Sequence, residues 1–274
     1  MRNLTGVLAL SLAAVAAPLA GEGIASLEIS GSTVSASIEL PGGVGADLTL
    51  AFEEALGLGV DSLGLSADLT SASALLGRLP SGASLPTAFP VVVRVEPPQS
   101  GPLSFSGIAS LELHTHNLAF TAGTPLRLFR AQSGGPFVDI TESMGMGSYR
   151  VRGSTGGFSE FIIVADTRSA DAVIESKYDA LQATLESDSS LDSALVAALQ
   201  GHIDASYSAY AAGSYVAAAQ EIESFADLVS DESGTAIPNV WRSARDLFNT
   251  AGELRAAAST LRLSLNLRAS SGPL

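Results

Sequence analysis

The chain changes character at Asp166, and this change constrains the fold more than any other feature of the sequence. Before Asp166, short runs of alternating apolar and polar residues are separated by glycine and proline, a pattern typical of β-strands joined by turns. After it, apolar residues recur every three or four positions along Ala-rich stretches, which is the spacing of amphipathic helices. We therefore predict an α+β protein. An N-terminal antiparallel β-sandwich, residues 23–166, precedes a separate C-terminal antiparallel helical bundle, residues 167–267, and a disordered tail, residues 268–274.

The first twenty residues contain the parts of a secretory signal peptide. Arg2 supplies a positive charge, an apolar run follows from Leu4, and small residues end the segment at Ala16 or Ala20, the two candidate cleavage sites. The apolar run is shorter than a transmembrane helix requires. We therefore expect residues 1–20 to be a signal peptide and the protein to be exported, to the periplasm or to the extracellular space. After removal of the signal, no integral membrane span is expected.

The composition excludes several classes of function. The chain has no cysteine, one lysine (Lys177) and a formal net charge of −14. Without cysteine there are no disulfides, no thiolate catalysis and no Cys-based zinc sites. Nucleic-acid binding needs clustered lysine and arginine to neutralise phosphates, so no nucleic-acid partner is expected. An acidic surface of this kind mainly favours solubility.

The first part of the chain predicts a series of short strands. Residues 24–29 and 34–40 alternate apolar and polar side chains and are separated by a turn around Gly31, as in a hairpin. Residues 48–76 have no clean period, and we expect a short helix near residues 52–56. Further strands are expected at residues 91–95, 111–116, 126–131, 137–140, 149–152 and 158–164.

The end of this part carries a resemblance to a known fold. Residues 125–130 end in Leu-Phe-Arg, residues 137–141 read Phe-Val-Asp-Ile-Thr, and residues 157–163 contain Phe-Ser-Glu-Phe. This series resembles the closing strands of immunoglobulin-like sandwiches in bacterial exported proteins. The resemblance implies a stalk, a spacer or a surface module.

The second part predicts four helices. The first covers residues 171–185, the second begins at Ser190 and ends at Gly213, and the third begins at Ser214. Pro238 suits the first turn of a fourth helix, in which Trp241 would face the core. Short connections between these helices imply antiparallel neighbours in a bundle.

The helical part also resembles a known module. Residues 191–261 are similar to FIMAH-type helical modules of secreted bacterial proteins in their helix spacing, in Gly213 and in Phe225, although the Ile-Met-Ala-His element is missing. The resemblance implies an accessory surface module rather than a catalyst.

One motif could carry chemistry. Glu112, His114 and His116 alternate along a predicted strand and therefore share one face, with Leu111 and Leu113 on the other. Two imidazoles and a carboxylate can bind zinc or iron. The motif thus leaves open a metal-dependent hydrolase or oxygenase, and the simpler alternative is a solvated strand face.

The remaining motifs favour no catalytic machinery. The segment at residues 157–161 begins like a nucleophile elbow but lacks the second glycine and the following helix. We therefore expect an exported non-catalytic binding or structural surface module rather than an enzyme, without a cofactor. Its partner would be a protein or a polysaccharide at the cell surface.

Overall fold

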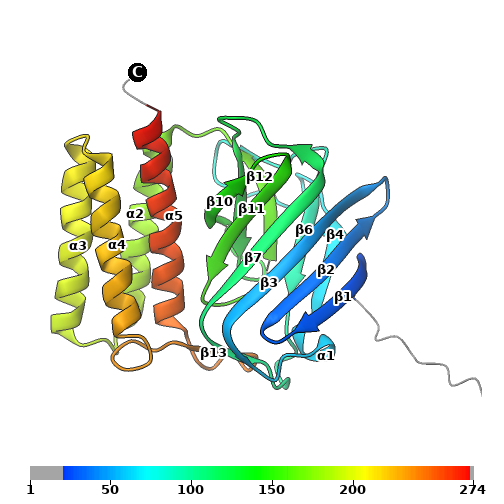
Figure 1. Ribbon diagram of the computed structural model, residues 1–274, viewed down its shortest axis with the longest axis horizontal. Helices are drawn as coiled ribbons and strands as arrows, with labels where there is room; N and C mark the ends of the chain where they lie inside the picture. The colour runs from blue at the N-terminus through cyan, green and yellow to red at the C-terminus, as the bar shows by residue number, and fades with distance from the viewer. Residues whose placement is uncertain (1–20, 159, 272–274) are drawn as a thin grey trace, which may run out of the picture.

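The computed structural model describes residues 21–158 and 160–271 (Figure 1). The expected signal peptide at residues 1–20 lies outside the described residues. The described chain is a mixed α+β structure with two antiparallel sheets and five helices. Four long helices lie side by side next to the sheets in Figure 1. Within these described residues, no helix is both long enough and apolar enough to cross a membrane.

The first sheet has seven strands in the order β1-β2-β3-β7-β11-β10, and β13 pairs with β7 outside this path. The hairpin predicted at the N-terminus is confirmed, with Gly31 at a φ of 59° in its turn. Only glycine adopts this left-handed conformation without steric cost. The strands are β1 (Ile24–Ser30), β2 (Thr33–Leu40), β3 (Val44–Leu56), β7 (Ser104–Ala119), β10 (Thr141–Gly145), β11 (Ser148–Thr155) and β13 (Val240–Arg242).

The second sheet has six strands in the order β4-β6-β12-β8-β9, and β5 pairs with β12. Its strands are β4 (Leu65–Leu69), β5 (Ala83–Ser84), β6 (Val91–Val95), β8 (Leu126–Ala131), β9 (Val138–Asp139) and β12 (Glu160–Asp166). Side chains from both sheets share one hydrophobic core, to which β3 and β7 contribute Leu48 and Leu111, and β6 and β12 contribute Val93 and Phe161. The period-two alternation of the sequence therefore marks the faces that meet in this core.

The helix predicted near residues 52–56 is wrong, because β3 continues as a strand through Leu56. Phe52 points into the core, a bulge follows, and Ala55 pairs with Phe105 on β7. The side chain of Glu54 on β3 accepts a hydrogen bond of 2.8 Å from Ser106 Oγ on β7. Pairing with a long neighbouring strand thus outweighs the local helix propensity of this segment. The short helix of this region, α1 (Val60–Leu63), comes later.

The first three predicted helices are present with small shifts at their ends. Side chains that accept backbone N–H groups fix the starts of two of them: Ser169 Oγ accepts from Ala172, and Asp192 Oδ1 accepts from Ala194. Apolar residues of the four long helices form a second core. The helices are α2 (Ala170–Ser187), α3 (Ser193–Ala211), α4 (Tyr215–Asp231) and α5 (Thr250–Ser270).

The fourth helix does not begin at Pro238. The chain instead returns to the sheet as β13, and Trp241 lies against Phe105 and Phe158, with ring centroids 5.4 and 5.1 Å away. Burial of the indole in this aromatic cluster outweighs the helical spacing of the segment. The helix α5 begins only after Asn249, and it includes residues 268–270, which the sequence placed in the tail.

Helix α5 connects the helices to the seven-stranded sheet. It packs on β7, β10 and β11, and its backbone comes so close that a Cβ on Gly252 would lie 2.6 Å from Gly107 O. Nearby, Arg255 forms two hydrogen bonds of 2.7 and 2.8 Å with the Glu53 carboxylate on β3. The absence of a side chain at position 252 therefore sets how tightly the helices approach the sheet.

Candidate functional site

The predicted His-x-His motif lies on the outer face of β7. Leu111 and Leu113 point into the core as predicted. Across the sheet, His116 Nε2 and His114 Nδ1 lie 3.2 and 3.6 Å from Asp47 Oδ2 on β3. The structure therefore brings the two histidines to Asp47, a residue that the strand pattern of the sequence did not indicate.

Glu112 does not join the two histidines. Its carboxylate faces β11, where Arg152 Nη2 lies 3.1 Å from Oε2 and Arg150 Nε lies 3.4 Å from Oε1. Arg150 Nη2 also lies 3.4 Å from His114 Nδ1. The described part of the chain contains no group of three or more His, Cys, Asp or Glu side chains placed to hold a metal ion. The arrangement on β7 is one of cross-strand ionic contacts.

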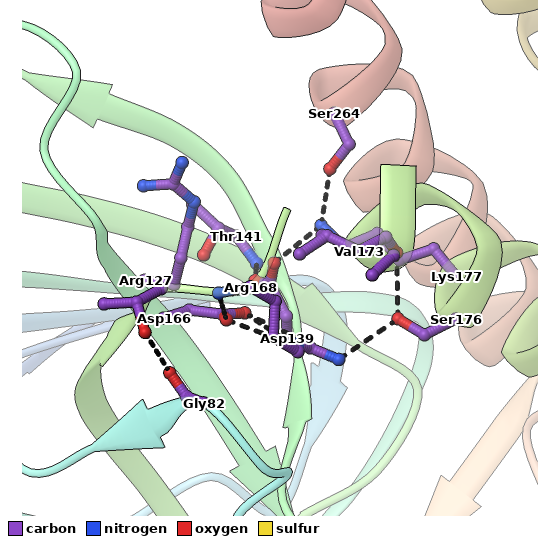
Figure 2. Close-up of polar contacts among 12 residues, drawn as sticks. Gly82, Arg127, Asp139, Thr141, Asp166, Arg168, Val173, Ser176, Lys177 and Ser264 are labelled. Carbon is purple, nitrogen blue, oxygen red and sulfur yellow. Dashed lines mark hydrogen bonds and ion pairs between the residues drawn. The ribbon is translucent and has the colours of Figure 1, made fainter. Parts of the chain in front are cut away.

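A buried ion pair joins the helices to the second sheet (Figure 2). Lys177 Nζ on α2 lies 2.7 Å from Asp139 Oδ2 on β9, and the two side chains are 6% and 3% exposed. Nζ also donates to Thr260 O, Thr260 Oγ1 and Ser264 Oγ on α5, at 3.1, 2.7 and 2.9 Å. Burial lowers the pKa of Lys177, and the negative charge of Asp139 opposes this shift.

Further polar groups surround this pair, as Figure 2 shows. The Thr141 N–H donates to Asp139 Oδ1 at 2.8 Å. Asp166 and Arg168 form an ion pair of 2.7 Å at the end of β12. Burial alone would raise the pKa of Asp166, but the hydrogen bonds and charge of Arg168 outweigh it, so this pKa is lowered. The junction of helices and sheet thus holds a network of charges that is shielded from water.

The sequence also indicates that Lys177 is buried, which the amino-acid composition alone does not show. Lys177 lies three residues after Ile174 and four before Leu181, so it occupies the apolar stripe of α2. A charged residue on the inward face of a helix must find a partner, because an unpaired buried charge is costly.

An open cleft lies where the turn between α2 and α3 meets the segment that connects α4 to α5. Its volume is about 730 Å³. Leu247 and Phe248 line it and are 44% and 48% exposed. Hydroxyl and amide groups, among them those of Ser190 and Asn239, line the rest. A smaller cavity of about 340 Å³ shares Leu247 and Phe248.

The charged groups that line the cleft are acidic. Asp188 Oδ1 accepts hydrogen bonds from Ser190 N at 3.0 Å and from Ser190 Oγ at 2.5 Å, and Oδ2 accepts from the Thr250 hydroxyl. Burial alone would raise the pKa of Asp188, but these hydrogen bonds lower it overall, so the carboxylate is ionised near neutral pH. Asp246, also in the lining, pairs with Arg242. The cleft therefore combines a half-exposed aromatic ring with fixed hydrogen-bonding groups.

The segment that carries Phe248 has an unusual backbone. Arg245 has a φ of 57°, and no other non-glycine residue among those described has a positive φ. For a residue with a Cβ, this conformation costs about 1–2 kcal/mol. Such cost is tolerated where the surrounding structure fixes the chain, and it is frequent at binding sites.

Comparison with protein families assigns the chain to one family. A family model described as a family of unknown function (DUF6689) matches residues 6–269, so the chain belongs to this family. The comparison with curated proteins finds no match.

Proposed function

We propose that this member of the DUF6689 family is an exported, non-catalytic module that binds a neutral polysaccharide at the cell surface. The binding site is the 730 Å³ cleft between the α2–α3 turn and the segment before α5. The observation that carries the proposal is the lining of this cleft, in which the half-exposed ring of Phe248 stands among hydroxyl, amide and carboxylate groups.

This lining suits a sugar in two ways. A pyranose ring has an apolar face that packs on an aromatic side chain, and its hydroxyls both donate and accept hydrogen bonds. The carboxylate of Asp188 and the amide of Asn239 offer acceptors and donors to such hydroxyls. The lining contains acids and no basic side chain, so it disfavours an anionic ligand.

The scaffold and the location belong to the same proposal. We take the two sheets as an immunoglobulin-like β-sandwich built from residues 23–166, to which β13 adds a strand, because residues of both sheets share one core. We take α2–α5 as a FIMAH-like bundle, because they share another. The signal-like residues 1–20 direct the protein to the periplasm or the extracellular space.

Affinity gel electrophoresis tests this function. Tag-free protein lacking residues 1–20 is run in native gels containing laminarin, dextran or mannan. We expect at least one polysaccharide to retard the protein, and Phe248→Ala to weaken this retardation about tenfold, a loss of about 1.4 kcal/mol. Leu76→Ala is the matched control, since Leu76 is 84% exposed and lies outside the cleft.

The two variants separate the ways in which the proposal can fail. If none of the three polysaccharides retards the wild-type protein, the ligand class is wrong. If Phe248→Ala and Leu76→Ala are retarded as strongly as the wild type, a polysaccharide binds elsewhere and the cleft is not its site. Far-UV circular dichroism checks that both variants are folded.

A further inference from the structure

We propose that Lys177 and Asp139 condense to an intramolecular amide that joins helix α2 covalently to strand β9. The link goes beyond the binding function, because it concerns how the helices are attached to the sheets. Asp139 ends β9 in the second sheet, and β10 of the first sheet begins two residues later, at Thr141. The amide would therefore fix the helices at the point where the chain passes from one sheet to the other.

The two reacting groups are already in contact. Lys177 Nζ lies 2.7 Å from Asp139 Oδ2, and the side chains are 6% and 3% exposed (Figure 2). Two groups held in this way react as if at very high concentration, because the entropy of bringing them together is already lost on folding. Their burial also keeps bulk water away from the product.

The oxygens around Nζ outnumber the hydrogens of its ammonium group by one. Four oxygens lie within 3.1 Å of Nζ: Asp139 Oδ2, Thr260 O, Thr260 Oγ1 and Ser264 Oγ. An ammonium has only three hydrogens to donate. Asp139 Oδ2 is the oxygen left without a hydrogen bond of good geometry, despite its distance from Nζ. Oδ2 is thus the oxygen that amide formation between Nζ and Cγ would release as water.

The first step requires a neutral amine. Burial lowers the pKa of Lys177, although the charge of Asp139 opposes this. Transfer of one proton from Nζ to Oδ2 across the 2.7 Å contact converts the ion pair to an amine and a carboxylic acid. Both products are neutral, which suits a site that water does not reach.

The second step forms the bond. The amine lone pair attacks Asp139 Cγ, and negative charge develops on Oδ1, which accepts the Thr141 N–H at 2.8 Å. Nitrogen then loses a second proton, which the hydroxyls of Thr260 and Ser264 can relay to the leaving oxygen. The C–N bond forms, the C–Oδ2 bond breaks and one water leaves, so no oxidant, reductant or other reactant is needed.

Intact-mass spectrometry of the denatured wild-type protein tests the proposal without any variant. We expect the measured mass to be lower, by one water, than the mass calculated from the residues of the purified protein. Because Lys177 is the only lysine, a protease digest should yield one branched peptide that joins the segments containing residues 139 and 177. Asp139→Ala and Lys177→Arg should each have the full mass of their sequences.

A second measurement uses the single ε-amino group. The denatured protein is treated with an amine-reactive reagent, and the peptide that contains Lys177 is examined. We expect no modification of Lys177 in the wild type and complete modification in Asp139→Ala. A wild-type protein with the full sequence mass and a modified Lys177 would overturn the proposal and leave a buried ion pair.

Discussion

Trp241 provides a direct test of how the helical part is anchored to the sheets. It lies on β13, between α4 and α5, but the residue is only 8% exposed, and its ring packs on Phe105 and Phe158 in the core shared by the sheets. Removing the ring by Trp241→Ala should therefore weaken the sheet core and the segment leading into α5 together. A fourth helix beginning at Pro238 would instead have placed this ring in the helical core.

The magnitude follows from the burial. Truncation of a buried tryptophan to alanine costs about 3–5 kcal/mol, since it removes apolar contact and leaves a cavity. For a domain of this size, such a loss lowers the melting temperature by roughly 6–20 °C, at about 2–4 °C per kcal/mol. The upper part of this range is expected, because the indole contacts two phenylalanine rings at 5.4 and 5.1 Å.

Urea unfolding, monitored by far-UV circular dichroism, measures the effect. Fluorescence is unsuitable, because Trp241 is the only tryptophan. Leu247→Ala is the control, since Leu247 is six residues away and 44% exposed, and this variant should change stability by less than about 0.5 kcal/mol. The reasoning is refuted if Trp241→Ala costs less than about 1 kcal/mol, or if the helical signal is lost at the same urea concentration as in the wild type.

Two further predictions concern a helix end and an ion pair. Gly213→Ala should destabilise by about 1–2 kcal/mol in urea unfolding, since φ is +75° there and a Cβ would contact nothing, so only the backbone conformation is penalised. Gly201→Ala, inside α3 with equally open surroundings, should stabilise by roughly 0.5–1 kcal/mol; the same sign for both variants would contradict this account. Burial alone would raise the pKa of Glu160, but hydrogen bonding and charge from Arg78 outweigh burial and lower this pKa. The ionised carboxylate therefore stabilises the fold above its unfolded pKa of about 4.3. This stabilisation is lost as the pH falls through the lower pKa of the folded state. Glu160→Gln should therefore reduce the fall in melting temperature below about pH 4. If the melting temperature of this variant falls with pH as steeply as that of the wild type, the Arg78–Glu160 pair contributes nothing to stability.

The parts of the fold that follow from local pattern were predictable from the sequence. Alternation identified β1, β2 and β8 and placed Leu111 and Leu113 in the core, and the apolar run at residues 91–95 identified β6. Helical spacing identified α2 to α4, because each has one apolar stripe facing a shared core. In these elements the local preference and the long-range packing agree.

The errors occur where a distant partner decides the local structure. The segment at residues 52–56 is a strand because β7 lies beside it, and the segment at residues 240–242 is a strand because Phe105 and Phe158 receive Trp241. In both cases the partner is far away in the sequence, so a local window contains no information about it. Tertiary contacts of this kind override helix propensity, which amounts to less than about 1 kcal/mol per residue.

The candidate sites also depend partly on local pattern, which the sequence shows, and partly on contacts with distant residues, which it does not. The strand period correctly placed His114 and His116 on one face, but the strand order decides what they meet, and it brings Asp47 on β3 to them and Arg152 on β11 to Glu112. Lys177 shows how far such reasoning can be extended. Its place in the apolar stripe of α2 requires a buried partner, since an isolated ammonium away from water costs several kcal/mol. In an acidic chain with a single lysine, the stripe alone thus predicts a Lys–carboxylate contact inside the protein, and the fold selects Asp139 as the carboxylate.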